Sequence, residues 1–180
     1  NLEDSDLNIE ESPNEKSYIE YAQATKDKKN PVSYSIENGT LTLKEAGNTG
    51  ASYYINVDIS FLQAALSSKN IEDYTKESSK YENYVTLYLP KDKLVSSAKI
   101  YLGYGDFYVK NATFDTTNIK LDDGDFDANT LTANSGKLTF SYGDCDLQKA
   151  SLGNISLTSK DGDLTVNELT LSGKTKIALS

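Results

Sequence analysis

The 180-residue sequence predicts an all-β protein, a right-handed three-sided parallel β-solenoid with an irregular β-rich N-terminal part and one short helix. Two observations carry this prediction. The dipeptide Gly-Asp recurs at intervals of nineteen residues, and apolar residues recur in columns with the same period. We expect the solenoid to be right-handed, because connections between parallel β-strands are generally right-handed. We assign residues 95–180 to the solenoid and residues 1–94 to an N-terminal part that is continuous with it in one structural domain.

The Gly-Asp pairs are expected to mark one corner of each coil. A second corner is expected at the polar column that begins with Lys110, and a third near Asn118, Gly136 and Gly173. Three short strands between three corners describe a coil, and like strands of successive coils stack about 4.8 Å apart. The four pairs are Gly105-Asp106, Gly124-Asp125, Gly143-Asp144 and Gly162-Asp163.

Apolar residues at alternate positions after each Gly-Asp are expected to face inward, because side chains alternate along a strand. Cys145 stands in one of these columns, so we expect a buried, inert thiol. Leu169 and Leu171 belong to a further inward pair. The two columns that follow the glycines are Phe107, Phe126, Cys145, Leu164 and Val109, Ala128, Leu147, Val166.

The N-terminal part shows no such period but contains several strand patterns. Asn38-Gly39 predicts a tight hairpin near residues 32–44. Apolar residues at helical spacing predict a short helix near residues 59–69, and a strand is expected over 53–57. The charged, serine-rich residues 71–83 are expected to form an exposed loop.

The composition excludes several classes of function. The chain has 18 lysines, no arginine, 27 acidic residues and a formal net charge of −9, so nucleic acid and anionic membranes are unexpected partners. With no His and a single Cys, it cannot form disulfide frameworks, Cys/His zinc sites or a Ser-His-Asp triad. No stretch approaches the ~20 apolar residues of a membrane span, so we expect no direct membrane insertion. We expect no catalytic residue and no cofactor.

The aspartates of the Gly-Asp pairs are the first candidate site. We interpret Asp106, Asp125, Asp144 and Asp163 as a structural ladder of turn residues, each accepting backbone N–H bonds. The alternative is a row of cations. Asp122, Asp123, Asp125 and Asp127 together resemble a calcium loop, although the Glu that such a loop requires at its twelfth position is missing.

Tyrosines form the second candidate site. Tyr101, Tyr104, Tyr108 and Tyr142 are expected at outward or corner positions, where they offer rigid contact area to a glycan or a protein. Alternatively, they are there because tyrosine suits strand surfaces.

The run from Tyr84 to Asp92, the segment Gly39-Thr40-Leu41-Thr42-Leu43 and the Gly-Asp coils resemble a bacterial family of β-strand repeats. This family is a domain of unknown function that is named for a predicted adhesin role. The resemblance implies an extracellular or cell-surface solenoid in an envelope-stress setting, tethered through a segment outside this chain. It supplies no catalytic residues.

Three functions stay open at this stage. The first is a non-catalytic, adhesin-like module that binds an unknown protein or glycan at the cell envelope. The second is a glycan-active lyase or hydrolase built on a β-helix. The third is a scaffold that self-associates edge to edge through the unpaired parallel strands at the end of the stack.

Overall fold

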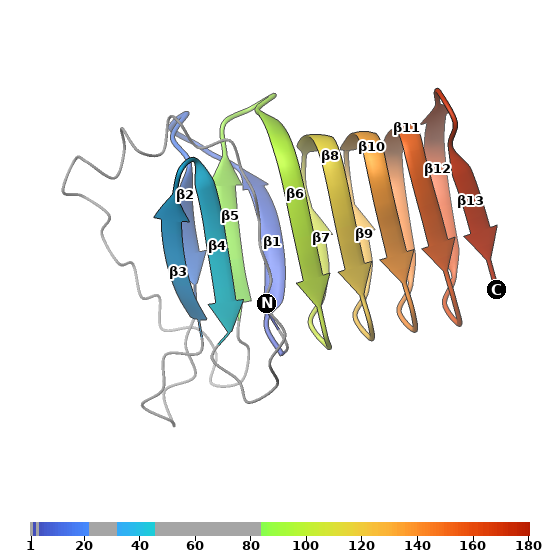
Figure 1. The fold of residues 1–180 in the computed structure, drawn as a ribbon, viewed down its shortest axis with the longest axis horizontal. Helices are drawn as coiled ribbons and strands as arrows, with labels where there is room; N and C mark the ends of the chain where they lie inside the picture. Colours follow the sequence, from blue (N-terminus) through green and yellow to red (C-terminus); the bar gives the residue numbers. More distant parts are fainter. Residues whose placement is uncertain (1, 3, 22–31, 46–83) are drawn as a thin grey trace.

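The structure, a computed structural model, describes residues 2, 4–21, 32–45 and 84–180. All regular elements in this part of the chain are strands. Eleven of the described strands form one sheet that is wound into a stack along the long axis of the molecule (Figure 1), and β3 and β4 form a separate two-stranded sheet. The helix predicted near residues 59–69, the strand over 53–57 and the loop over 71–83 lie outside the described residues.

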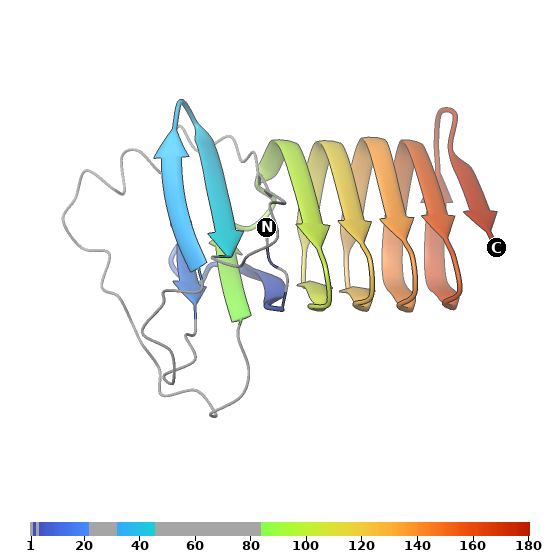
Figure 2. The same ribbon diagram turned by 60° about the horizontal axis from the view of Figure 1, so that its bottom comes forward.

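The solenoid consists of two layers of parallel strands. Strands β6, β8 and β10 lie in front, and the short strands β7 and β9 lie behind them (Figure 1). Strand β11 pairs with β9 through its first residues and with β10 through the rest, so it passes from one layer to the other. Figure 2 shows the same coils side by side in a turned view. The bounds are β6 Leu94–Leu102, β7 Phe107–Val109, β8 Ala112–Leu121, β9 Phe126–Ala128, β10 Leu131–Phe140, β11 Cys145–Ser159, β12 Leu164–Leu171 and β13 Lys176–Leu179.

The strand register confirms the period of nineteen and the inward columns. Phe107 pairs with Phe126, Phe126 with Cys145, and Cys145 with Leu164. The rings of Phe107 and Phe126 stack with centroids 5.1 Å apart, and both side chains are fully buried. Cys145 is buried as well, and burial raises the pKa of its thiol far above the usual range. The columns therefore form one continuous apolar core.

The side-chain alternation changes slightly before Asn118 and Gly136, near which a corner was predicted. The inward and outward alternation changes at residues 115–116 and 134–135, where two consecutive residues face away from the core. Thr117 is consequently buried, and the neighbouring Asn118 faces outward. Gly136 lies opposite Thr117 with φ +127, and an added Cβ would lie 1.8 Å from the Thr117 carbonyl oxygen.

The last coils depart from the pattern in two ways. Leu157 pairs with Ile177, twenty residues away, so the chain carries one extra residue near Gly173, which has φ +63. Leu169 and Leu171 are 41% and 52% exposed, although we placed them among the inward residues. They are exposed because, among the described residues, no further strand covers them.

The N-terminal part contributes three strands, β1, β2 and β5, to the same sheet as the solenoid strands. Strand β1 (Asp6–Glu11) lies between β5 (Tyr84–Leu89) and β7 and pairs in parallel with both. Leu7 is the partner of Val85 on one side and of Phe107 on the other. Strand β2 (Tyr18–Tyr21) pairs antiparallel with β5. One coil is therefore completed by residues from the start of the chain.

The predicted hairpin is confirmed. Strands β3 (Val32–Glu37) and β4 (Thr40–Glu45) are joined by Asn38 and Gly39, with φ values of 50 and 75. Positive φ at both central residues defines the type I′ turn that matches the twist of the strands. Glu45 accepts hydrogen bonds from the backbone N–H of Asp4, at 3.0 Å, and from the Ser5 hydroxyl, at 2.9 Å. These bonds tie the hairpin to the start of β1.

A substitution at Gly124 tests whether the stack requires the close approach of successive coils. A Cβ at this position would lie 2.0 Å from the Gly105 carbonyl oxygen, so Gly124→Ala must push two coils apart. We expect a loss of roughly 1–3 kcal/mol in the free energy of unfolding, measured with urea. The control is Asp123→Ala at the exposed neighbouring position. Equal unfolding midpoints for the two variants would show that the stack tolerates the added methyl group.

Candidate functional site

The aspartates of the Gly-Asp pairs form a hydrogen-bonded column. In each case one carboxylate oxygen accepts the backbone N–H of the corresponding aspartate in the next coil. These bonds fix the turns relative to one another and give the carboxylates of Asp106, Asp125 and Asp144 a backbone donor. The bonds join Asp106 to Asp125 at 2.9 Å, Asp125 to Asp144 at 2.8 Å, and Asp144 to Asp163 at 2.9 Å.

Asp6 extends this column by one coil, and the sequence analysis missed it. Its Oδ1 accepts the backbone N–H of Asp106 at 2.9 Å. A buried serine, Ser5, precedes it in place of glycine, so a search for Gly-Asp could not find it. The usable signal was the spacing Asp6-Leu7-Asn8-Ile9, which repeats the pattern of an aspartate followed by alternating apolar residues.

The four residues of the calcium hypothesis have separate surroundings. Asp122 bonds to Lys120, Asp125 belongs to the column, Asp123 is exposed in a turn, and Asp127 faces outward from β9 beside Asp146. Burial and then the neighbouring carboxylates, that of Asp146 first, raise the pKa of Asp127. Across the described segments, no group of three or more acidic, His or Cys side chains has the arrangement of a metal site.

Two of the four candidate tyrosines lie on the same edge of the solenoid. Tyr104 and Tyr142 are 64% and 66% exposed, and they stand in the turns that follow β6 and β10. These turns project along the lower edge in Figure 1. Asp123 and Asp161 occupy the corresponding place in the turns after β8 and β11. We call Tyr104, Asp123, Tyr142 and Asp161 the turn ridge. Its tyrosines are two coils apart, about 10 Å.

Tyr101 lies next to the turn ridge in a polar network. Its hydroxyl donates to Asp122, whose other carboxylate oxygen is 2.6 Å from the Lys120 ammonium group. That ammonium group also lies 4.4 Å from the centre of the Tyr101 ring. The bond to Asp122 is the main cause that raises the pKa of Tyr101. Burial opposes ionisation of Asp122, but the bonds from Lys120, Tyr101 and Ser141 outweigh it and lower the pKa of this carboxyl.

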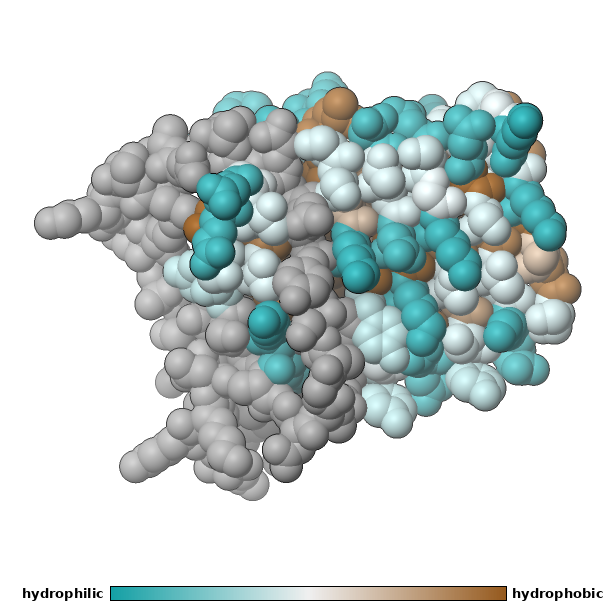
Figure 3. All heavy atoms as spheres, viewed as in Figure 1, coloured by the Kyte–Doolittle hydropathy of each residue, from teal (hydrophilic) through white to brown (hydrophobic). Residues whose placement is uncertain are grey.

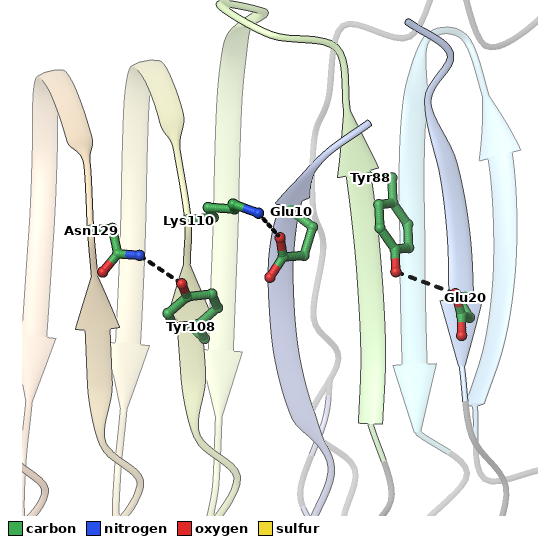
Figure 4. A network of polar contacts seen from close by, with 6 residues as sticks. All are labelled: Glu10, Glu20, Tyr88, Tyr108, Lys110 and Asn129. Atoms are coloured by element: carbon green, nitrogen blue, oxygen red, sulfur yellow. Dashed lines mark hydrogen bonds and ion pairs between the residues drawn. The ribbon is translucent and has the colours of Figure 1, made fainter. Parts of the chain in front are cut away.

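Tyr108 lies on the opposite layer and belongs to a different surface. Its hydroxyl accepts a bond from the Asn129 amide at 2.7 Å, and Lys110 forms an ion pair with Glu10 at 3.2 Å (Figure 4). Lys110 and Asn129 are successive members of the polar column that marks the second corner. The structure therefore does not gather the four candidate tyrosines into one site.

A second group of tyrosines, which the sequence analysis did not single out, surrounds Glu20. Tyr88 donates to Glu20 at 3.3 Å (Figure 4), and its ring stacks on Tyr18 with centroids 4.3 Å apart. Burial, followed by the charge of Glu20, raises the pKa of Tyr88 to about 12. The same two causes raise the pKa of Tyr18 and of Tyr84. No sequence signal places Tyr18 opposite Tyr88, because their strands are far apart in the chain.

Fold and site together define a parallel β-solenoid with a fixed row of turns and an exposed ridge of aromatic and acidic side chains. The chain belongs to the Toastrack DUF4097 family, whose match covers residues 1–178, and this is a family of unknown function. The resemblance to a β-repeat family of unknown function is thus confirmed, and the match carries no adhesin role. Neither the curated proteins nor the solved structures contain a match. Within the described ranges there is no helix with the length and hydropathy to cross a membrane.

Asp125 tests whether the column serves the turns or holds cations. Asp125→Ala removes the acceptor of the Asp144 N–H, and we expect a loss of roughly 1 kcal/mol in the free energy of unfolding. Asp125→Asn keeps an acceptor and removes one of the charges that repel along the column, so its stability should equal or exceed that of the wild type.

Urea unfolding in EDTA and in millimolar Ca²⁺ separates the two interpretations. If the aspartate column only stabilises the turns, calcium should leave the urea midpoint of the wild type unchanged. A midpoint that rises with calcium in the wild type but not in Asp125→Asn would establish a cation site instead.

Proposed function

We propose that the protein is a non-catalytic binding module of the bacterial cell envelope that holds a glycan chain along its turn ridge. The observation that carries this proposal is the pair Tyr104 and Tyr142, both about two-thirds exposed and two coils apart on a rigid edge. Because these two aromatic side chains are exposed, packing of the core does not explain their position.

The chemistry of the ridge suits a sugar chain. The face of a tyrosine ring packs on the C–H face of a pyranose, and its hydroxyl remains available for a hydrogen bond. Asp123 and Asp161 stand in the intervening and following turns, where their carboxylates can accept bonds from sugar hydroxyls. The aspartate column holds these turns in place, so little ordering is needed when a ligand binds.

A glycan hydrolase is the enzymatic alternative, and one observation favours it. Asp127 and Asp146 are direct partners on β9 and β11, and the pKa of Asp127 is raised. Hydrolases use two carboxyl groups on either side of the scissile bond, one of them protonated. However, Asp127 and Asp146 lie side by side in one outward row of the layer, whereas a hydrolase places its two carboxyl groups on either side of the scissile bond. We therefore propose binding without turnover.

Location and coil geometry complete the proposal. The family resemblance supports a position outside the cytoplasm, with a tether in a segment beyond this chain. We also infer a right-handed, three-sided coil, because parallel β connections favour that hand and the side-chain alternation changes within the long strands as well as at the turns. An experimentally determined structure checks both features of the coil.

Binding to cellohexaose and chitohexaose, measured by calorimetry, tests the ridge. The double variant Tyr104→Ala/Tyr142→Ala should bind at least about tenfold more weakly than the wild type, because each stacked ring contributes on the order of 1 kcal/mol. The matched control is Tyr34→Ala, which removes an exposed tyrosine of the hairpin. Equal affinity of the double variant and the control would contradict glycan binding by the turn ridge. Release of reducing ends from either oligosaccharide would contradict a non-catalytic role.

Self-association is a second candidate function, favoured by the exposed apolar residues at the end of the stack. Leu171 and Leu179 are 52% and 62% exposed, and in the described part of the chain β12 and β13 pair only with β11. Unpaired strand edges of this kind recruit further strands. Sedimentation at increasing protein concentration should show a rising mass that Leu171→Lys/Leu179→Lys abolishes. A constant monomer mass removes this candidate.

A further inference from the structure

Two sets of stacked segments, one in each layer of the solenoid, carry charged side chains of opposite sign. In the segments 97–102, 116–121, 135–140, 154–159 and 176–179, which stack on one another, every charged residue is a lysine. The segments 106–109, 125–128, 144–147 and 163–166 of the other layer contain acidic residues and no lysine. The four lysines are Lys99, Lys120, Lys137 and Lys176.

These four lysines follow the solenoid axis in a line. Lys99, Lys137 and Lys176 belong to one row of paired residues, in which Asn118 and Ser156 stand between them. Lys120 is in the next outward row, opposite Tyr101. Successive lysines of the first row are therefore two coils, or about 10 Å, apart. Figure 3 shows strongly hydrophilic side chains crossing the face of β6, β8 and β10 in such a row. We call these four residues the lysine line.

The net charge of −9 does not prevent an anion from reaching this line. Stacked sheets are about 10 Å apart, and the outward side chains add several ångströms on each side. The carboxylates of the opposite layer are thus farther from the lysine line than the Debye length of about 8 Å at physiological salt. Asp122 is nearer, and it pairs with Lys120 at 2.6 Å, so Lys99, Lys137 and Lys176 carry most of the attraction. The expectation that nucleic acid and anionic membranes are not partners stays a prediction.

We propose that the lysine line binds an acidic polysaccharide with one anionic group per disaccharide, which runs parallel to the solenoid axis. This inference rests on the proposed glycan-binding function and names the class of ligand. The lysine line and the turn ridge share a two-coil period. Lys99 and Tyr104 belong to one coil, and Lys137 and Tyr142 lie two coils further on. The hydroxyl groups of Thr139, Ser156 and Thr158 lie on the same face and can donate to the chain.

The spacing distinguishes this ligand from other polyanions. Double-stranded DNA carries a charge for about every 1.7 Å of its axis, far denser than one lysine per two coils. An anionic bilayer is a plane of charge, whereas the lysine line is only one or two rows wide. A polymer with widely spaced charges and hydroxyl groups between them fits both the line and its neighbours.

Hyaluronan decasaccharide is the probe, because its repeating disaccharide carries one carboxylate. The variant Lys99→Gln/Lys137→Gln should bind it about tenfold more weakly than the wild type and with a smaller dependence on salt, since surface ion pairs each contribute up to roughly a factor of five. The control Lys16→Gln/Lys91→Gln changes the net charge equally at two exposed positions outside the line, and should bind like the wild type. Equal weakening in both variants, or none in the first, overturns the proposal.

Chitohexaose, which is neutral, separates this inference from the proposed function. The variant Lys99→Gln/Lys137→Gln should keep its affinity for chitohexaose, whereas loss of that affinity would mean that the line is not a distinct site for anionic groups. If the wild type binds hyaluronan through the lysines but Tyr104→Ala/Tyr142→Ala binds chitohexaose normally, the turn ridge fails and the lysine line stands. Phosphatidylglycerol vesicles or poly(dT) that bind more tightly than hyaluronan, with the same dependence on Lys99 and Lys137, would overturn the assignment to a polysaccharide.

Discussion

The close stacking of one coil on the next is the constraint on which the rest of this structure depends. Parallel strands pair only at about 4.8 Å, so backbone atoms of neighbouring coils meet at every turn. At Gly105, Gly124, Gly143 and Gly162 the space for a Cβ is occupied by a carbonyl oxygen of the coil below. Across the same gap, the backbone N–H of the aspartate that follows each glycine donates to the carboxylate of the aspartate in the coil below. The turns cannot drift, because both the steric contact and the hydrogen bond fix their height.

The surface inherits this regularity. Each outward position in one coil lies directly beside the corresponding position of the next coil. Outward side chains are therefore arranged in rows along the solenoid axis. Tyr104 and Tyr142 acquire a fixed separation in this way, and so do Lys99 and Lys137. An acidic chain can therefore still present a row that contains Lys99, Lys137 and Lys176 along one layer. A binding surface for an extended polymer needs such repetition more than it needs a cavity.

The N-terminal strand shows how the regular stack is completed by an irregular element. After β5 the chain goes directly to β6, and the level beneath β7 is taken by β1 from the beginning of the chain. Asp6 then accepts the Asp106 N–H as a Gly-Asp residue would, and Leu7 and Ile9 continue the inward columns. The hairpin is joined to the same strand through Glu45. Closing this coil brings together segments about one hundred residues apart, which makes it a slow, non-local step of folding.

The sequence by itself determined the repeating part of this protein. The period of nineteen, the inward columns through Phe107 and Val109, and the Asn38-Gly39 turn all follow from spacing, because strand alternation and turn chemistry are local. Only the tertiary structure decided the insertion of β1 between β5 and β7, the change of alternation at residues 115–116 and the alignment of lysines in one row. These depend on which remote segments pair and which way each outward row faces. The pairing of remote segments and the direction of each outward row are set by how whole coils pack together, and the sequence of a single coil does not specify them.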